Sequence, residues 1–167
     1  EAAVWDSDES SNINSIYSAS GALDLTSLSP LSWWRMGDGD TWGGSSWTLT
    51  DNGSGGNDAT SVNMEEADRL PISPNSYSQN SFVFDGIDEY ITLGNSSTFN
   101  ITGDQSVSCW LKFTDSGSTR YVVNIKDIYG IYTNSGKIFG TSRISGAFKS
   151  VGSIANYNDG NWHHVLF

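Results

Sequence analysis

Residues 81–114 read SFVFDGIDEYITLGNSSTFNITGDQSVSCWLKFT, and this stretch decides the fold class. Three runs within it alternate large apolar residues with small or polar ones, at residues 82–84, 90–93 and 107–113. A period of two predicts strands with one buried face and one more polar face. Between the first two runs, Gly86 offers the backbone freedom that a tight turn needs, so we expect these runs to form a hairpin.

The third run places its larger apolar residues on one face and Trp110 on the other, which predicts that both faces are covered. Cys109 is the single cysteine, so an intrachain disulfide and a cysteine-based zinc site are excluded. Its place in a strand predicts a buried, unreactive thiol. Trp5, Trp33 or Trp34, Trp110 and Trp162 also lie in strand patterns and are expected in the core.

Short strand candidates continue through the second half of the chain, separated by glycine, asparagine and serine. They lie at residues 120–125, 128–132, 137–139, 147–154 and 162–167. Even spacing of this kind predicts an all-β, two-sheet antiparallel sandwich. His163 and His164 are adjacent on a strand and therefore point to opposite faces, which predicts one packed histidine and one nearer the surface.

The pattern FDGIDEYITL followed by VSCWLKF resembles the laminin-G-like domains of the concanavalin A-like lectin/glucanase superfamily. DGNWHHV at residues 159–165, WRMGD at 34–38 and TDNGSGGND at 50–58 resemble further elements of these domains, in the same order. The resemblance implies a jelly roll and a non-catalytic role in binding or spacing. One short N-terminal helix is expected after the capping side chains of residues 8–11, where Ile13 and Ile16 lie on one face.

The domain boundaries follow from where these patterns stand. Residues 1–20 resemble the closing strand and helix of a preceding or permuted laminin-G-like repeat, residues 21–30 form a linker, and residues 31–167 form a jelly roll that lacks its last strands. The sequence is then a window from a tandem-repeat protein. In the alternative, the closing strand completes the sheet in permuted form, or is donated by a neighbouring copy.

The net charge of the chain limits the classes of partner that it can bind. Eight basic residues stand against 19 acidic ones, a net charge of −11, and this disfavours a nucleic-acid partner. No apolar run approaches the roughly 20 residues needed to cross a bilayer, so no membrane insertion is expected. Partners are expected to be a glycan or cell-surface ligand, and neighbouring repeats or other copies of the protein. The expected location is extracellular or on the surface of a virion.

Oxygen-bearing side chains among glycines suit Ca²⁺, which takes six to eight hard oxygen ligands. Turn formation explains the same residues equally, because aspartate and asparagine tolerate positive φ. A structural Ca²⁺ site is predicted with side-chain ligands from Asp38, Asp51, Asn57, Asp58 and Asp85.

Trp42 and Trp47 flank a Gly-Gly-Ser-Ser segment, and exposed rings in such a setting can stack on sugar faces. The two are the predicted ligand-binding residues. In the alternative, the rings pin a long loop onto the sandwich.

The chain is not expected to be an enzyme. None of its five glutamates falls into the E-x-D-x-x-E pattern of the superfamily's glycosidases, and the sequence has no G-x-S-x-G, Walker loop or metalloprotease motif. The predicted function is a non-catalytic adhesion or recognition module of a larger protein. Two alternatives remain: a structural decoration or tail-fibre component of a bacteriophage with a role in assembly, and an accessory domain of a glycoside hydrolase.

Overall fold

The computed structural model describes residues 1–72, 77–94, 96–115, 117–125 and 128–167. The chain divides into two compact units, Glu1–Ser106 and Val107–Phe167. The boundary between them lies far from residues 21–30, where the sequence suggests a linker.

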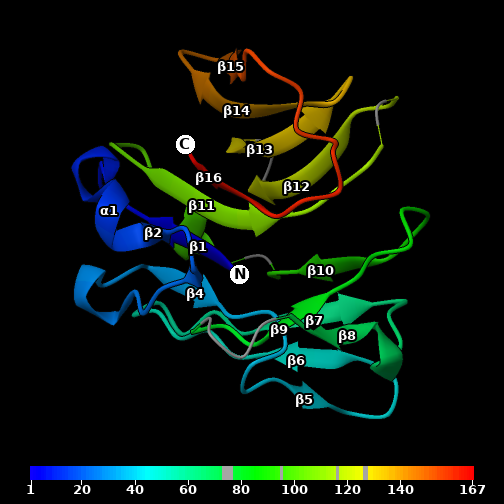
Figure 1. The fold of residues 1–167 in the computed structure, drawn as a ribbon. Helices are drawn as coiled ribbons and strands as arrows, with labels where there is room; N and C mark the ends of the chain where they lie inside the picture. The colour runs from blue at the N-terminus through cyan, green and yellow to red at the C-terminus, as the bar shows by residue number, and fades with distance from the viewer. Residues whose placement is uncertain (73–76, 95, 116, 126–127) are drawn as a thin grey trace. The chain divides into compact units, whose positions relative to one another are not determined.

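The first unit consists of short strands, 3-10 turns and one four-residue α-helix (Figure 1). In chain order these are β1 (Ala2–Trp5), η1 (Ser10–Asn12), α1 (Ile13–Ile16), β2 (Tyr17–Ser18), β3 (Gly21–Ala22), η2 (Thr26–Leu28), β4 (Ser32–Trp34), β5 (Thr41–Trp42), β6 (Trp47–Leu49), β7 (Ala59–Val62), η3 (Glu66–Asp68), β8 (Arg69–Pro71), β9 (Asn80–Phe82), β10 (Tyr90–Thr92) and η4 (Ser97–Phe99).

Strand β1 pairs antiparallel with β4, so that Ala3 lies opposite Trp33. The first strand and the strand after the expected linker therefore belong to one sheet of one unit. Trp5, Trp33 and Trp34 are all buried there. Rings of this size each remove about 150–250 Å² of surface from water, which makes them the main anchors of this core.

The prediction that residues 82–84 and 90–93 pair as a hairpin is wrong. Strand β9 pairs with β8, and β10 pairs with β7. The segment between β9 and β10 contains a local turn, in which the backbone amide of Ile87 donates to the Asp85 side chain at 2.7 Å. Gly86 does take the positive φ expected of it, +75°.

The second unit is an antiparallel sheet of strands in chain order, together with one further strand pair. The sheet holds β12 (Arg120–Ile125), β13 (Tyr129–Asn134), β14 (Lys137–Ile144) and β15 (Ala147–Gly152); the pair is β11 (Ser106–Leu111) and β16 (His163–Leu166). Ser135 and Gly136, and then Ser145 and Gly146, have positive φ. Two-residue turns of this kind match the twist of the strands that they join.

The fold class is confirmed: the described residues form antiparallel β-sheets, with one short helix near the N-terminus. Cys109 is buried as expected, and burial raises the pKa of its thiol to about 12. Trp162 departs from the expected core, since it is 40% exposed and lies just before β16. Among the described residues there is no helix with the length and apolar character that a membrane span requires.

Candidate functional site

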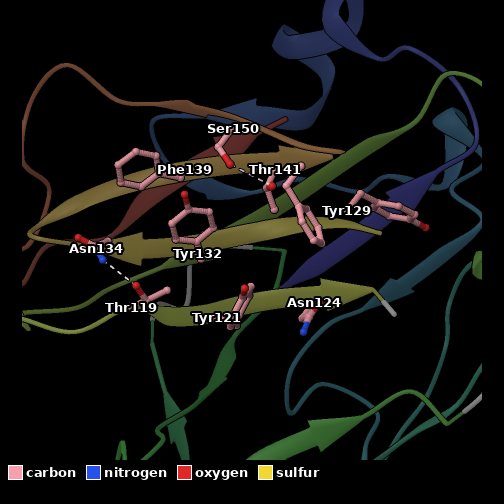
Figure 2. Close-up of a pocket in the computed structure, with 10 residues that line it drawn as sticks. Thr119, Tyr121, Asn124, Tyr129, Tyr132, Asn134, Phe139, Thr141 and Ser150 are labelled. Atoms are coloured by element: carbon pink, nitrogen blue, oxygen red, sulfur yellow. Dashed lines mark hydrogen bonds between the residues drawn. The ribbon is translucent and has the colours of Figure 1, made fainter. Parts of the chain in front are cut away.

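A pocket of about 510 Å³ lies on one face of the β12–β15 sheet in the second unit (Figure 2). This volume is within the range of small-molecule sites, about 300–1,000 Å³. Its lining residues come from all four of these strands and the residue before β12: Thr119, Tyr121, Asn124, Tyr129, Tyr132, Asn134, Phe139, Thr141, Phe148 and Ser150.

Cross-strand register explains why most of these residues share a face; Tyr129 is the exception, because it pairs with Ser142 and so belongs by register to the opposite side. Tyr121 lies opposite Tyr132, which lies opposite Phe139, and directly paired residues of an antiparallel sheet project to the same side. Asn124 reaches this side because the register shifts between Tyr121 and Val123, as at a β-bulge. Strict alternation would place Tyr121 and Asn124 on opposite faces.

Aromatic rings form the apolar part of the pocket. The ring centroids of Tyr121 and Tyr132 are 5.9 Å apart, and those of Tyr132 and Phe139 are 4.9 Å apart with planes only 5° from parallel. The Phe139 ring lies over Gly152, where a Cβ would overlap it. Tyr121 and Phe148 are 61% and 55% exposed, so both remain accessible to a ligand.

Neutral polar groups surround the rings. The Asn134 Nδ2 atom donates to Thr119 Oγ1 at 2.6 Å, and Ser150 Oγ donates to Thr141 Oγ1 at 3.1 Å (Figure 2). The Tyr129 hydroxyl is neutral at pH 7, as tyrosine ordinarily is, and burial raises its pKa further. None of the ten lining residues is an aspartate, glutamate, histidine, cysteine, lysine or arginine. The pocket can therefore stack against a ligand and form neutral hydrogen bonds, and its ten described lining residues include no acid–base pair.

The two predicted tryptophans lie in the first unit, paired across β5 and β6 with centroids 5.5 Å apart. Trp47 is 3% exposed, its Nε1 donates to the Glu65 carbonyl at 3.1 Å, and its ring packs against Phe82. A ring so covered has no free face for a sugar, so the structure favours the packing role for Trp47. Trp42 is half-buried, and sugar contact at this residue stays a prediction.

Three of the predicted calcium ligands come together at the end of β6. The two carboxylate oxygens of Asp51 accept hydrogen bonds of 2.7–2.8 Å from Ser32 Oγ and from the backbone amides of Trp33, Gly53 and Asn57. The side chain of Asp58 accepts from the Asp51 amide at 2.9 Å. These oxygens therefore already serve the loop as hydrogen-bond acceptors.

The remaining two predicted ligands lie elsewhere. Asp38 pairs with Arg35 at 3.3 Å and accepts from the Gln79 amide at 2.6 Å, whereas Asp85 closes its own turn. Within the described ranges, no group of three or more histidine, cysteine, aspartate or glutamate side chains is arranged to hold a metal ion. The structure thus does not gather the five residues into one site, and calcium binding stays a prediction.

The two histidines are both half-buried, but they have different partners. His164 lies 2.8 Å from Ser108 Oγ and packs against the Trp110 ring, and burial lowers its pKa to about 4. His163 Nε2 lies 2.8 Å from Asp159, whose pKa this contact lowers to about 2.

Sequence reasoning missed the pocket, although most of its residues fall in strands that the sequence predicts. One signal in the sequence could have indicated the pocket: along these strands every second residue is aromatic or polar, as in Tyr132 and Asn134, and in Phe139 and Thr141. Comparison of the chain with protein-family models, curated proteins and solved structures finds no match.

Proposed function

We propose that the chain is a non-catalytic carbohydrate-binding module, and that it binds glycan on the β12–β15 face. The observation that carries this proposal is a lining that joins aromatic rings to neutral hydrogen-bonding groups on a sheet. Sugars present C–H faces, which pack on aromatic rings, and hydroxyls, which amides and hydroxyl side chains recognise.

The absence of acid–base chemistry in the lining supports a binding role over glycoside hydrolysis. Most glycoside hydrolases use two carboxyl groups about 5–9.5 Å apart beside the glycosidic bond, and none of the ten described lining residues carries one. The resemblance to laminin-G-like domains points the same way, since it implies adhesion or recognition at an extracellular or virion surface.

The test is binding of the full chain to a glycan array. Tyr121→Ala removes an exposed ring from the pocket and should lower the strongest signals about tenfold, as expected for a central aromatic contact. Val151→Ala is the matched control, because Val151 is an exposed apolar residue that pairs with Gly140 on the other face of the same sheet.

Trp42→Ala tests the rival position in the first unit. Loss of signal in this variant, with Tyr121→Ala unchanged, would move the binding site to the tryptophan predicted from the sequence. An array without signal for the wild-type chain would overturn the proposed function.

A further inference from the structure

In the described part of the sheet, two cations lie on the pocket face, one near each end of β14 and just beyond the neutral lining. Lys137 pairs across the sheet with Asn134, and Arg143 pairs with Phe148, and both partners line the pocket. Directly paired residues share a face, so Lys137 and Arg143 lie on the pocket side. Lys149 pairs with Ser142, between Thr141 and Arg143, and therefore belongs to the opposite side.

Among the described residues, neither cation forms an ion pair with a neighbour. In the described part of the second unit, ion pairs join Arg120 to Asp115 and His163 to Asp159, and neither Lys137 nor Arg143 takes part in one. The Arg143 guanidinium lies 5.7 Å from the centroid of the Phe148 ring, and its Nε donates to the Gly146 carbonyl at 3.3 Å. These contacts hold the guanidinium beside the pocket.

The distribution of charge along the sequence isolates these cations further. Residues 107–167 contain six basic and three acidic residues, a net charge of +3, whereas residues 1–106 contain two basic and sixteen acidic residues, a net charge of −14. The pocket therefore lies in the one basic part of an acidic chain, which favours an anionic ligand there.

The spacing of the two cations limits the charge density of that ligand. They are six residues apart on one strand, about 20 Å at the usual rise. A densely sulfated chain is matched by clustered basic residues, and the net charge of −11 opposes it. Two isolated cations around neutral rings match a glycan whose negative charges are single and separated by uncharged sugars.

We propose that the ligand of this face is an acidic glycan of low charge density, with uronic-acid carboxylates at Lys137 and Arg143 and neutral sugars on the rings between them. The inference rests on the proposed function and names its ligand class. Arg143 offers paired N–H donors to a carboxylate, and Lys137 offers a point charge.

The experiment titrates the full chain with a hyaluronan octasaccharide, in which carboxylates alternate with neutral sugars, and with its uncharged carboxyl methyl ester. The wild-type chain should bind the acid about tenfold more tightly than the ester, and 500 mM NaCl should remove most of this preference, because salt screens exposed charges. The double variant Lys137→Gln/Arg143→Gln should bind both forms equally. The matched control Lys149→Gln should keep the wild-type preference, and circular dichroism verifies the fold of each variant.

The possible outcomes separate the inference from the function on which it rests. Equal binding of acid and ester by the wild-type chain overturns the acidic ligand but leaves glycan binding in place, and this comparison needs no variant. The acidic-glycan proposal is also overturned if the wild-type chain binds a heparin octasaccharide more tightly than the hyaluronan octasaccharide. The same holds if it binds an octaglutamate peptide as tightly as the hyaluronan octasaccharide. Failure to bind either octasaccharide overturns the inference, and the glycan array decides whether the proposed function falls with it.

Discussion

Gly130 pairs with Asn124, just beyond the register shift of β12, and it shows how one missing side chain shapes the site. A Cβ at this position would overlap the carbonyl oxygen of Val123, which is backbone and cannot rotate away. The close approach of β13 to β12, and with it the placement of Asn124 on the pocket side, therefore requires glycine.

Gly130→Ala should lower the free energy of unfolding by about 1–3 kcal/mol, because the added methyl group forces the two strands apart. Urea unfolding followed by circular dichroism measures the change. Gly103→Ala is the matched control, since no heavy atom lies within 4 Å of its added Cβ, and it should stay within about 0.5 kcal/mol of wild type. Equal stability of the two variants would show that β12 and β13 can separate at no cost.

His164 should make stability depend on pH between about 6.5 and 4. Burial lowers its folded pKa to about 4, so within this range the unfolded chain binds the proton and the folded chain does not. Stability therefore falls as the pH drops from 6.5 towards 4, by up to about 3 kcal/mol from this residue. The measurement is the difference in urea unfolding between wild type and His164→Gln across this range.

Asp159 does not obscure the effect, because its lowered pKa moves its own contribution below about pH 4. His164→Gln should be less stable than wild type at pH 7, since the packed ring beside Trp110 is lost, and the two curves should converge at low pH. Parallel curves would mean that the ring takes up its proton without cost in the folded protein.

At the scale of elements, the tight turns of the β12–β15 sheet offer a stabilising substitution. Ser145 has φ of +51° and is followed by Gly146 at +81°, the geometry of a two-residue hairpin turn. Asparagine tolerates positive φ better than serine does, so Ser145→Asn should raise the free energy of unfolding by about 0.5 kcal/mol. Ser145→Val, which resists positive φ, should lower it, and the urea midpoints of the two variants should fall on opposite sides of wild type.

The strands themselves are the part of the fold that the sequence predicts well. The run 120–125 coincides with β12, and most other predicted strands differ from the observed ones by a few residues at their ends. Alternation is local, and a strand shows it wherever its partner lies. Pairing is not local, which is why the segments that became β9 and β10 were wrongly paired with each other.

The candidate site was beyond sequence reasoning for the same reason. Tyr121, Val122 and Val123 are all large, so the pattern does not say which side of β12 is buried, and the register shift then changes the alternation. Trp42 and Trp47 are easy to predict as ligand-binding residues because two tryptophans flank a short glycine-containing segment. The residue type alone, however, does not indicate whether a side chain is exposed, and Trp47 is buried.

For the whole molecule, the acidic residues should make stability respond to salt. The first unit holds sixteen acidic against two basic residues, so NaCl should screen their mutual repulsion. Raising NaCl from 20 to 300 mM should increase the melting temperature by about 3 °C, equivalent to about 1 kcal/mol for a chain of this size. Differential scanning calorimetry measures this, and an unchanged or lower melting temperature would contradict it.

The same measurement distinguishes screening from calcium binding. At matched ionic strength, CaCl₂ should give the same melting temperature as NaCl if only screening acts, and a higher one that grows with Ca²⁺ concentration if an ion binds the folded chain. Asp85→Asn serves as an internal check. Because Asp85 lies apart from the Asp51 and Asp38 hydrogen-bond networks, this variant should leave any Ca²⁺-dependent rise in melting temperature at those residues unchanged.

The chain-order pairing of β12 to β15 also bears on how fast the protein gains its order. Each of these strands pairs with the next one along the chain through a short connection, so closing the loops costs little chain entropy. In contrast, β1 pairs with β4, and β7 pairs with β10, and in both cases the partner lies about thirty residues further along the chain. During refolding, the ribbon near the carboxyl end is therefore expected to assemble ahead of the segments that precede it. Its aromatic face would then be exposed to solvent, and to other unfolded chains, before the rest of the protein is in place.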